Sequence, residues 1–148
     1  MKRGVVNASV VFDDASIEKI GQNLKYDIKV LHRYKVPVNG PLFDTMIAAW
    51  LIDPRPLGGY YGLKNLAWTR LGVEMTPIED LIGSGRKQIT MDRVPVDKEA
   101  AYACADVDMT HRLVPILEGE LKEKQLWSVF TEVEMPLITA LAAMEMRG

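Results

Sequence analysis

Hydrophobic residues recur at three- and four-residue spacing along most of the chain, which predicts a mainly helical protein. Over residues 27–34 this spacing predicts a helix, and the stretch 36–41, with its two prolines and one glycine, brings it to an end. A second helix is expected directly after Asp44, because an aspartate before an apolar run is suited to cap a helix N-terminus. Apolar residues just before Gln22 predict a short strand.

The middle of the chain predicts two shorter helices. Residues 63–71 form an amphipathic pattern that Gly72 closes, and a flexible glycine-rich loop at 58–62 precedes it. The sequence Thr-Pro-Ile-Glu at 76–79 has the order of a capping box, with a hydroxyl, a proline at the first helical position and a glutamate two residues after it. That pattern predicts a helix that ends at Gly83.

The C-terminal third predicts the longest helix of the chain. Asp97 is expected to cap a helix that continues to about Ile116, and Pro115 is expected to kink or break it. Two further helices are expected at residues 126–131 and 136–146. The predicted organisation is therefore a short strand region followed by helices.

Composition excludes several classes of protein. The 148 residues are 48% hydrophobic and 26% charged, which suits a globular unit of one domain or slightly less. A net charge of -2 gives no basic footprint for nucleic acid, so such a contact would need local Lys or Arg or bound cations. No apolar run approaches about 18 residues, so we expect a soluble, cytoplasmic protein without a membrane partner. The single cysteine, Cys104, and the tryptophans Trp50, Trp68 and Trp127 are expected in the core.

Three residues suggest metal-dependent hydrolysis of a phosphodiester. Tyr102 and Asp106 are four residues apart on a predicted helix, so their hydroxyl and carboxylate share one face. Asp27 is a second carboxylate, and carboxylate oxygens are the ligands that hard divalent cations prefer. The spacing alone is a weak signal, because tyrosines and aspartates at helical spacing are mostly packing and surface residues.

The segments 21–27, 43–46 and 102–108, in this order, resemble the 3'-5' proofreading exonuclease domain of bacterial DNA polymerase I. The resemblance implies an α/β, ribonuclease H-like exonuclease fold and a site with four acidic metal ligands and a tyrosine. Asp27 matches the second motif, and Tyr102 with Asp106 matches the third, so all three are implied to be catalytic. Asp27 and Asp106 would bind divalent metal ions, Mg²⁺ or else Mn²⁺ or Zn²⁺.

Four further residues are candidates for binding the DNA strand. Gln22 and Asn23 match strand-binding positions of the family, although they could also cap the turn that follows. Ile78 matches an apolar position beside the 3'-terminal base, and its alternative role is that of a core residue. Arg86 lies in a basic loop and could contact a phosphate or be an ordinary solvated charge. The implied partners are the single-stranded 3' end of DNA and the remainder of the polymerase polypeptide.

The chain departs from the family pattern before Asp27. The family has an Asp-x-Glu pair on an earlier strand, and residues 1–26 contain no acidic pair at that spacing. Asp97 and Glu99 have the spacing, but they lie at a helix start, where capping explains them better. We therefore expect an N-terminally truncated fold that is mostly helical with a residual short sheet, and a chain that is nearly inactive by itself.

The same comparison predicts two regions and leaves two alternatives open. Residues 1–131 resemble a partial exonuclease domain, and residues 132–148 resemble the start of the polymerase thumb. One alternative is a non-catalytic DNA-binding or scaffolding module of a polymerase. The other is an RNA exonuclease similar to ribonuclease D, which shares the Tyr-x-x-x-Asp motif, although the C-terminal segment favours a polymerase. Ala101 stands where a related subclass has histidine, which excludes that subclass.

Overall fold

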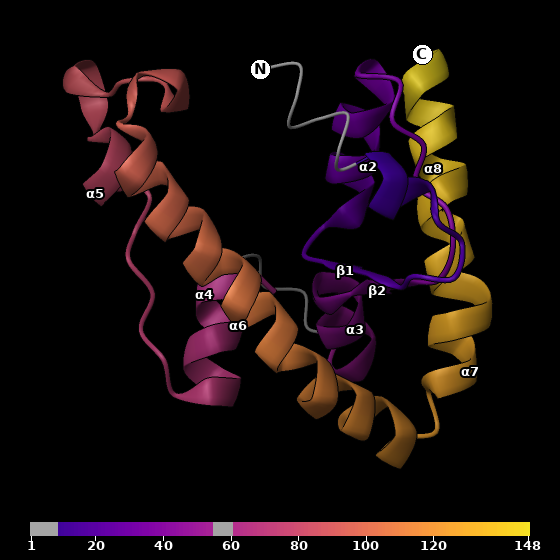
Figure 1. Ribbon diagram of the computed structural model, residues 1–148. Helices are drawn as coiled ribbons and strands as arrows, with labels where there is room; N and C mark the ends of the chain where they lie inside the picture. Colours follow the sequence, from indigo (N-terminus) through magenta and orange to yellow (C-terminus); the bar gives the residue numbers. More distant parts are fainter. Residues whose placement is uncertain (1–8, 55–60) are drawn as a thin grey trace.

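The computed structural model describes residues 9–54 and 61–148 of the chain, so residues 58–60 of the predicted loop lie outside the described part. Helices dominate this part, with a small sheet that lies between α2 and α3 in the body (Figure 1). The elements are β1 (Lys19–Gly21), α2 (Leu24–Arg33), β2 (Leu42–Asp44), α3 (Thr45–Ile52), α4 (Leu63–Leu66), η1 (Ala67–Leu71), α5 (Glu79–Ile82), η2 (Gly85–Lys87), η3 (Met91–Arg93), α6 (Val96–Glu123), α7 (Trp127–Val129), η4 (Phe130–Glu134) and α8 (Met135–Arg147). The mostly helical fold with a short sheet was predicted and is confirmed.

The sheet has two parallel strands. Lys19, Ile20 and Gly21 of β1 lie opposite Leu42, Phe43 and Asp44 of β2. A parallel pair needs a crossover connection, and α2 provides it. Within the described residues β1 is paired with β2 alone, so no strand covers its other edge. The strand before Gln22 was predicted, whereas β2 was not.

One hydrophobic core joins the sheet to the helices. Leu113, Leu117 and Leu121 recur every four residues on α6 and are completely buried. Phe43 of β2 and Phe130 of η4 pack together with their ring centroids 5.0 Å apart. The core is completed by Leu24, Ala48, Ala49, Ile52, Leu66, Met135 and Ile138. Residues from β2, α2, α3, α4, α6, η4 and α8 therefore form a single packed unit.

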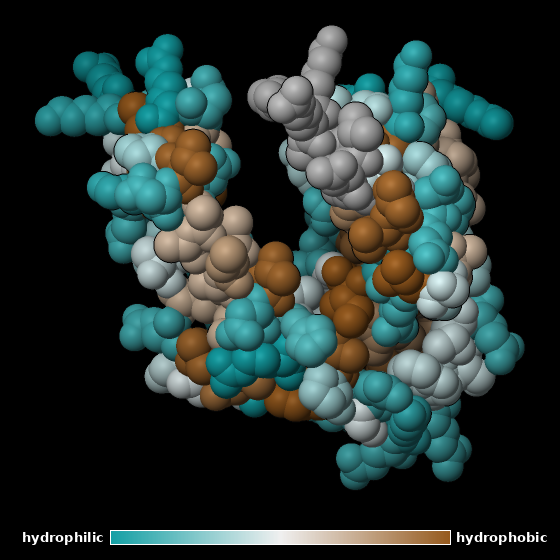
Figure 2. Space-filling model, viewed as in Figure 1, coloured by the Kyte–Doolittle hydropathy of each residue, from teal (hydrophilic) through white to brown (hydrophobic). Residues whose placement is uncertain are grey.

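Only the C-terminal half of α6 belongs to this core. Its first buried residues are Met109 and Thr110, and the residues before them are exposed or partly exposed. Figure 1 shows α6 running diagonally, so that its N-terminal half and α5 form an arm beside the body. In Figure 2 hydrophobic side chains gather along the hollow between this arm and the body. Tyr102 and Asp106 lie on the arm.

Helix α8 packs against α2 and contributes to the same core. Glu145 binds Lys25 at 2.7 Å and Lys29 at 2.6 Å, and these contacts lower the pKa of Glu145 to about 2. Because this pKa lies below the ordinary glutamate value of 4.5, this carboxylate stabilises the fold above about pH 4.5, and that contribution is lost as the pH falls towards 2. Exposure to solvent keeps the contribution small.

The predicted boundary between two regions at residue 132 lies within η4, just before α8. Helix α8 packs on α2, so the residues after this boundary are part of the same packed body.

Gly40, in the turn before β2, has a backbone conformation and a close neighbour that leave no room for a side chain. Its φ is +92°, and an added Cβ would lie 2.7 Å from the backbone oxygen of Ala15. Gly72 has a φ of +67°, yet a Cβ there would meet no atom within 4 Å. We expect Gly40→Ala to destabilise the protein by about 2–3 kcal/mol and Gly72→Ala by about 1 kcal/mol. Urea unfolding measures both, and equal losses would contradict the proposed backbone clash.

Three predicted helix boundaries are wrong or only partly right. Pro115 lies inside α6 without ending it. A proline has no N–H to donate to the carbonyl of the residue four positions earlier, which is His111. Because Pro115 and His111 are both exposed, water can bind that carbonyl instead. Asp97 does not cap α6, because the helix begins one residue earlier, with Pro95 as the N-cap residue. The residues 76–79 form no capping box, since α5 begins at Glu79 and no side chain caps it. In contrast, Gly72 ends the segment 63–71 as predicted.

Several residues expected in the core are exposed. Trp50 is 44% exposed and Trp68 is 61% exposed, while Trp127 packs against the core. Cys104 is exposed because it lies on the arm of α6, where no other element covers it. Helical spacing predicts that a face is apolar, but it does not guarantee a partner for that face. Among the described helices none is both long enough and apolar enough to cross a membrane.

Candidate functional site

Asp27 and Asp106 line one cavity of about 530 Å³, although they are far apart in the sequence. Asp27 comes from α2 and Asp106 from the arm of α6. The cavity lies beside the unpaired edge of β1, because Ile20 and Gly21 are part of its wall. Its other lining residues are Gln22, Leu63, Ala103, Val107, Thr110 and His111. We refer to this space as the carboxylate groove.

Tyr102 lies next to this groove in an adjoining hollow of about 220 Å³ between the segment 75–81 and α6. Asp106 lines both spaces, so it shares one space with Asp27 and the other with Tyr102. The adjoining hollow is completed by Met75, Thr76, Asp80, Leu81, Ala101 and Ala105. The structure thus brings the three predicted catalytic residues to one region of the molecule.

Asp44 fixes the start of the helix that carries Asp27. Its buried carboxylate accepts hydrogen bonds from the backbone N–H of Asn23 at 3.1 Å and of Leu24 at 2.7 Å. It also caps α3 by accepting from Met46 at 2.9 Å and from Ile47. One carboxylate therefore joins the N-termini of two helices. The predicted capping role is confirmed, and the link to α2 adds to it.

Burial raises the pKa of both carboxyl groups of the groove. For Asp27 the main cause is loss of water around the carboxylate, and the negative charge of Asp44 adds to it. For Asp106 the main cause is again burial, and the positive charge of Lys64 partly opposes it. Negative charge in a partly dry groove is costly unless a cation compensates it. Both carboxylates are therefore suited to bind a positively charged ligand.

The carboxylate groove fits a divalent metal ion in the kind of donor but not in number. Carboxylate oxygens suit Mg²⁺ and Mn²⁺. A site for two such ions needs about four acidic ligands, and the described residues contain no group of three or more His, Cys, Asp or Glu side chains that could hold a metal. Asp27 and Asp106 alone would bind a cation weakly.

The four predicted strand-binding residues lie in different settings. Gln22 lines the carboxylate groove, but its side chain also donates to the carbonyl of Tyr61 at 2.6 Å and accepts from the hydroxyl of Thr45. Asn23 precedes α2 in a left-handed conformation with a φ of 64°. Ile78 is partly buried at the start of α5, and Arg86 is exposed in η2. Asn23, Ile78 and Arg86 do not line the groove, and the role of all four residues in strand binding stays a prediction.

Two residues of this region have no clear signal in the sequence. Lys64 of α4 places its Nζ 5.6 Å from the centroid of the Tyr102 ring. His111 lines the carboxylate groove, although no acidic residue at ligand spacing in the sequence marks it. Both approach the site through packing between helices, which spacing along one helix does not predict. The one available signal for Lys64 was its positive charge on the predicted helix 63–71, but the sequence does not show that this helix faces the Tyr-Asp pair.

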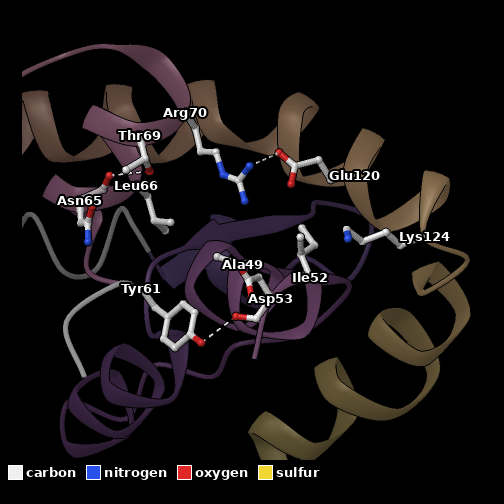
Figure 3. Close-up of a pocket in the computed structure, with 10 residues that line it drawn as sticks. All are labelled: Ala49, Ile52, Asp53, Tyr61, Asn65, Leu66, Thr69, Arg70, Glu120 and Lys124. Atoms are coloured by element: carbon white, nitrogen blue, oxygen red, sulfur yellow. Dashed lines mark hydrogen bonds and ion pairs between the residues drawn. The ribbon is translucent and has the colours of Figure 1, made fainter. Parts of the chain in front are cut away.

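A larger cavity of about 580 Å³ lies near the other end of α6 and contains none of the predicted site residues (Figure 3). Arg70 and Glu120 form an ion pair of 2.8 Å across it, and the hydroxyl of Tyr61 donates to the backbone oxygen of Asp53 at 2.8 Å. Its two cations, Arg70 and Lys124, are matched by the carboxylates of Asp53 and Glu120. The three predicted catalytic residues therefore lie elsewhere, at the carboxylate groove and the adjoining hollow.

Comparison with known proteins defines the class of protein that has this fold and groove. A family model described as 3'-5' exonuclease matches residues 5–122, and the chain belongs to that family. Among curated proteins it is 44% identical over 133 residues to DNA polymerase I of Chloroflexus aurantiacus. It is 35% identical over 148 residues to DNA polymerase I of Rhizobium leguminosarum and 34% identical over 141 residues to that of Pseudomonas aeruginosa.

These matches cover most of the chain but a small part of each relative. They include 88% of the chain for the Chloroflexus protein, 100% for the Rhizobium protein and 93% for the Pseudomonas protein. The chain spans only 14%, 14% and 15% of these relatives in the same order. The predicted resemblance to the exonuclease domain of DNA polymerase I is confirmed.

Proposed function

We propose that this chain forms part of the proofreading 3'-5' exonuclease site of a DNA polymerase I, which hydrolyses the 3'-terminal phosphodiester of DNA. The observation that supports it is the carboxylate groove, where Asp27 and Asp106 meet from α2 and α6. Family membership gives the class of reaction, and the groove gives the place for it. The two parallel strands would belong to a ribonuclease H-like sheet whose remaining strands pair with the free edge of β1.

The described residues would each contribute a separate property to this reaction. Asp27 and Asp106 would hold divalent metal ions, with Mg²⁺ as the first candidate and Mn²⁺ or Zn²⁺ as alternatives. When bound, such ions stabilise the charge that develops on a phosphate and lower the pKa of water. Tyr102 would orient the attacking water through its hydroxyl, because a phenol is a poor base at neutral pH. Gln22, Asn23, Ile78 and Arg86 would bind the single strand.

Alone, the chain should be almost inactive. Each missing acidic ligand removes attraction that compensates a hard cation for its lost hydration shell. Further acidic ligands would come from the remainder of the polymerase polypeptide. The completed site would act on the single-stranded 3' end of DNA in the cytoplasm. The scarcity of acidic ligands among the described residues also supports a second candidate, a non-catalytic DNA-binding module.

An extended chain tests the proposal. The segment that precedes the matched region in the Chloroflexus polymerase is fused to the N-terminus, and release of 3'-terminal nucleotides is measured on a 5'-labelled single strand. We expect the fusion to degrade DNA with Mg²⁺ at least about a hundredfold faster than the chain alone, and EDTA to abolish the activity. DNA and RNA strands of one sequence are compared, so that an RNA exonuclease is recognised.

The result also separates the two candidates. A fusion that folds and binds the strand but leaves its 3' end intact would favour the non-catalytic module. Robust metal-dependent degradation by the unextended chain would show that the proposed shortage of ligands is wrong. Circular dichroism of both proteins provides the control for folding.

A further inference from the structure

Lys64 faces both members of the Tyr-Asp pair from a different helix. It lies at the start of α4, with its Nζ 5.6 Å from the centroid of the Tyr102 ring. Its charge acts on the carboxyl group of Asp106. The side chain is partly buried, and α4 packs on α6. The stem of Lys64 is therefore held by packing while its ammonium group reaches the arm of α6.

The ammonium group of Lys64 is not used in an ion pair. None of the ion pairs within residues 9–54 and 61–148 includes it. Arg70, on the same helical segment, shows the contrast, because its guanidinium binds Glu120 at 2.8 Å. Contact with the Tyr102 ring is a cation-π interaction, which leaves the three N–H donors of a lysine able to bind another group.

The two carboxylates of the groove repel the negatively charged DNA phosphate that the proposed function requires. Asp27 and Asp106 are both negative, and a DNA phosphate would approach them from solvent. Metal ions would compensate the carboxylates, but a fixed cation is needed to hold a phosphate in a set position beside them. Lys64 lines neither the groove nor the adjoining hollow, but its ammonium group lies 5.6 Å from the ring centroid of Tyr102, whose hollow shares Asp106 with the groove, so it is the cation that the geometry offers.

We propose that Lys64 is a phosphate-binding residue of this site and holds the terminal phosphodiester of single-stranded DNA next to Tyr102 and Asp106. The identity of the strand rests on the proposed function. The ammonium group donates to a phosphate oxygen, and Tyr102 keeps that group close to the scissile bond. Lys64 thus sets where the strand lies and takes no part in proton transfer.

Binding of a fluorescein-labelled oligo(dT) single strand to the complete 148-residue chain tests this proposal. Anisotropy is measured in EDTA over a range of salt concentrations, so neither metal binding nor hydrolysis enters the result. We expect Lys64→Met to weaken binding about threefold to tenfold and to reduce the slope of log affinity against log salt by about 0.7. We expect Lys64→Arg to restore most of the affinity, because arginine also binds phosphate and stacks on an aromatic ring.

Lys124→Met is the matched control. Lys124 is an exposed lysine at the C-terminal end of α6, roughly 30 Å along the helix from Tyr102 at 1.5 Å per residue. We expect the Lys124→Met protein to bind the strand with the same affinity as the unmodified chain. The proposal is overturned if Lys64→Met retains full affinity, if Lys124→Met loses as much, if Lys64→Arg is as weak as Lys64→Met, or if the unmodified chain does not bind. Lys64-dependent binding combined with an inactive extended fusion would overturn the exonuclease proposal alone.

Discussion

Asp44→Ala is expected to destabilise the protein by about 4 kcal/mol, a large part of the 5–15 kcal/mol typical of a domain. The carboxylate is completely buried and accepts hydrogen bonds from four backbone N–H groups, two at the start of α2 and two at the start of α3. Alanine would leave these donors buried without an acceptor at two helix N-termini. Urea unfolding followed by circular dichroism measures the loss.

Asp97→Ala is the control for this prediction. Asp97 is also an acidic residue in the first turn of a helix, but it is exposed and makes no capping hydrogen bond. Its replacement should change stability by no more than about 0.5 kcal/mol. Asp44→Asn, which keeps one side-chain oxygen as an acceptor, should fall between the two. A loss below about 1 kcal/mol for Asp44→Ala would show that the junction of the two helices does not depend on this carboxylate.

Asp44 also shows how far the sequence predicts the fold. Its role as a cap follows from residues close to it in the chain, and the structure confirms that role. Its bonds to Asn23 and Leu24 join segments about twenty residues apart, and no local pattern predicts them. The same limit applies to β2, because its pairing with β1 joins distant segments of the chain and its last residue is directly followed by α3.

The wrong predictions have a related cause. The Thr-Pro-Ile-Glu order at 76–79 fits a capping box, yet the helix that forms there is one turn long and begins at Glu79. Trp68 lies on a helix whose packed face is elsewhere, so its indole stays exposed. In each case the residues have the right types, and the outcome depends on which neighbour packs against them.

The candidate site was predictable in two stages. Helical spacing alone places Tyr102 and Asp106 on one face of α6, while their candidate role came from the resemblance to a family. The association of Asp27 with them came from the resemblance to a family, because sequence spacing does not bring α2 beside α6. Lys64 had neither signal. Its position emerges only from the packing of α4 on α6, where its ammonium group meets the Tyr102 ring.

The division of α6 links stability to function. Its C-terminal half contributes fully buried leucines to the core, whereas its N-terminal half leaves the body and presents Asp106 to the groove and Tyr102 to the adjoining hollow. Substitutions on the arm should therefore change chemistry with little effect on folding. That separation makes the arm suitable for testing the proposed reaction directly.

Asp106→Asn in the extended fusion is expected to lower hydrolysis of the 3'-terminal phosphodiester by about a thousandfold. The amide keeps the shape of the side chain but removes the negative charge that would hold a divalent cation at the groove, and such a cation contributes several kcal/mol to stabilising the charge of the transition state. Tyr102→Phe should cost less, about tenfold to a hundredfold, because its hydroxyl would only orient water. Initial rates on a 5'-labelled single strand at saturating Mg²⁺ measure both effects.

Asp108→Asn is the matched control, because this exposed carboxylate lies two residues further along the same helix and pairs with Arg112 at 3.7 Å. Two residues along a helix turn the side chain by about 200°, so Asp108 faces away from Asp106 and its loss should change the rate less than twofold. Equal losses for the variants at 106 and 108 would indicate a general effect of charge on the arm. A fully active Asp106→Asn fusion would place the cation site elsewhere than the carboxylate groove.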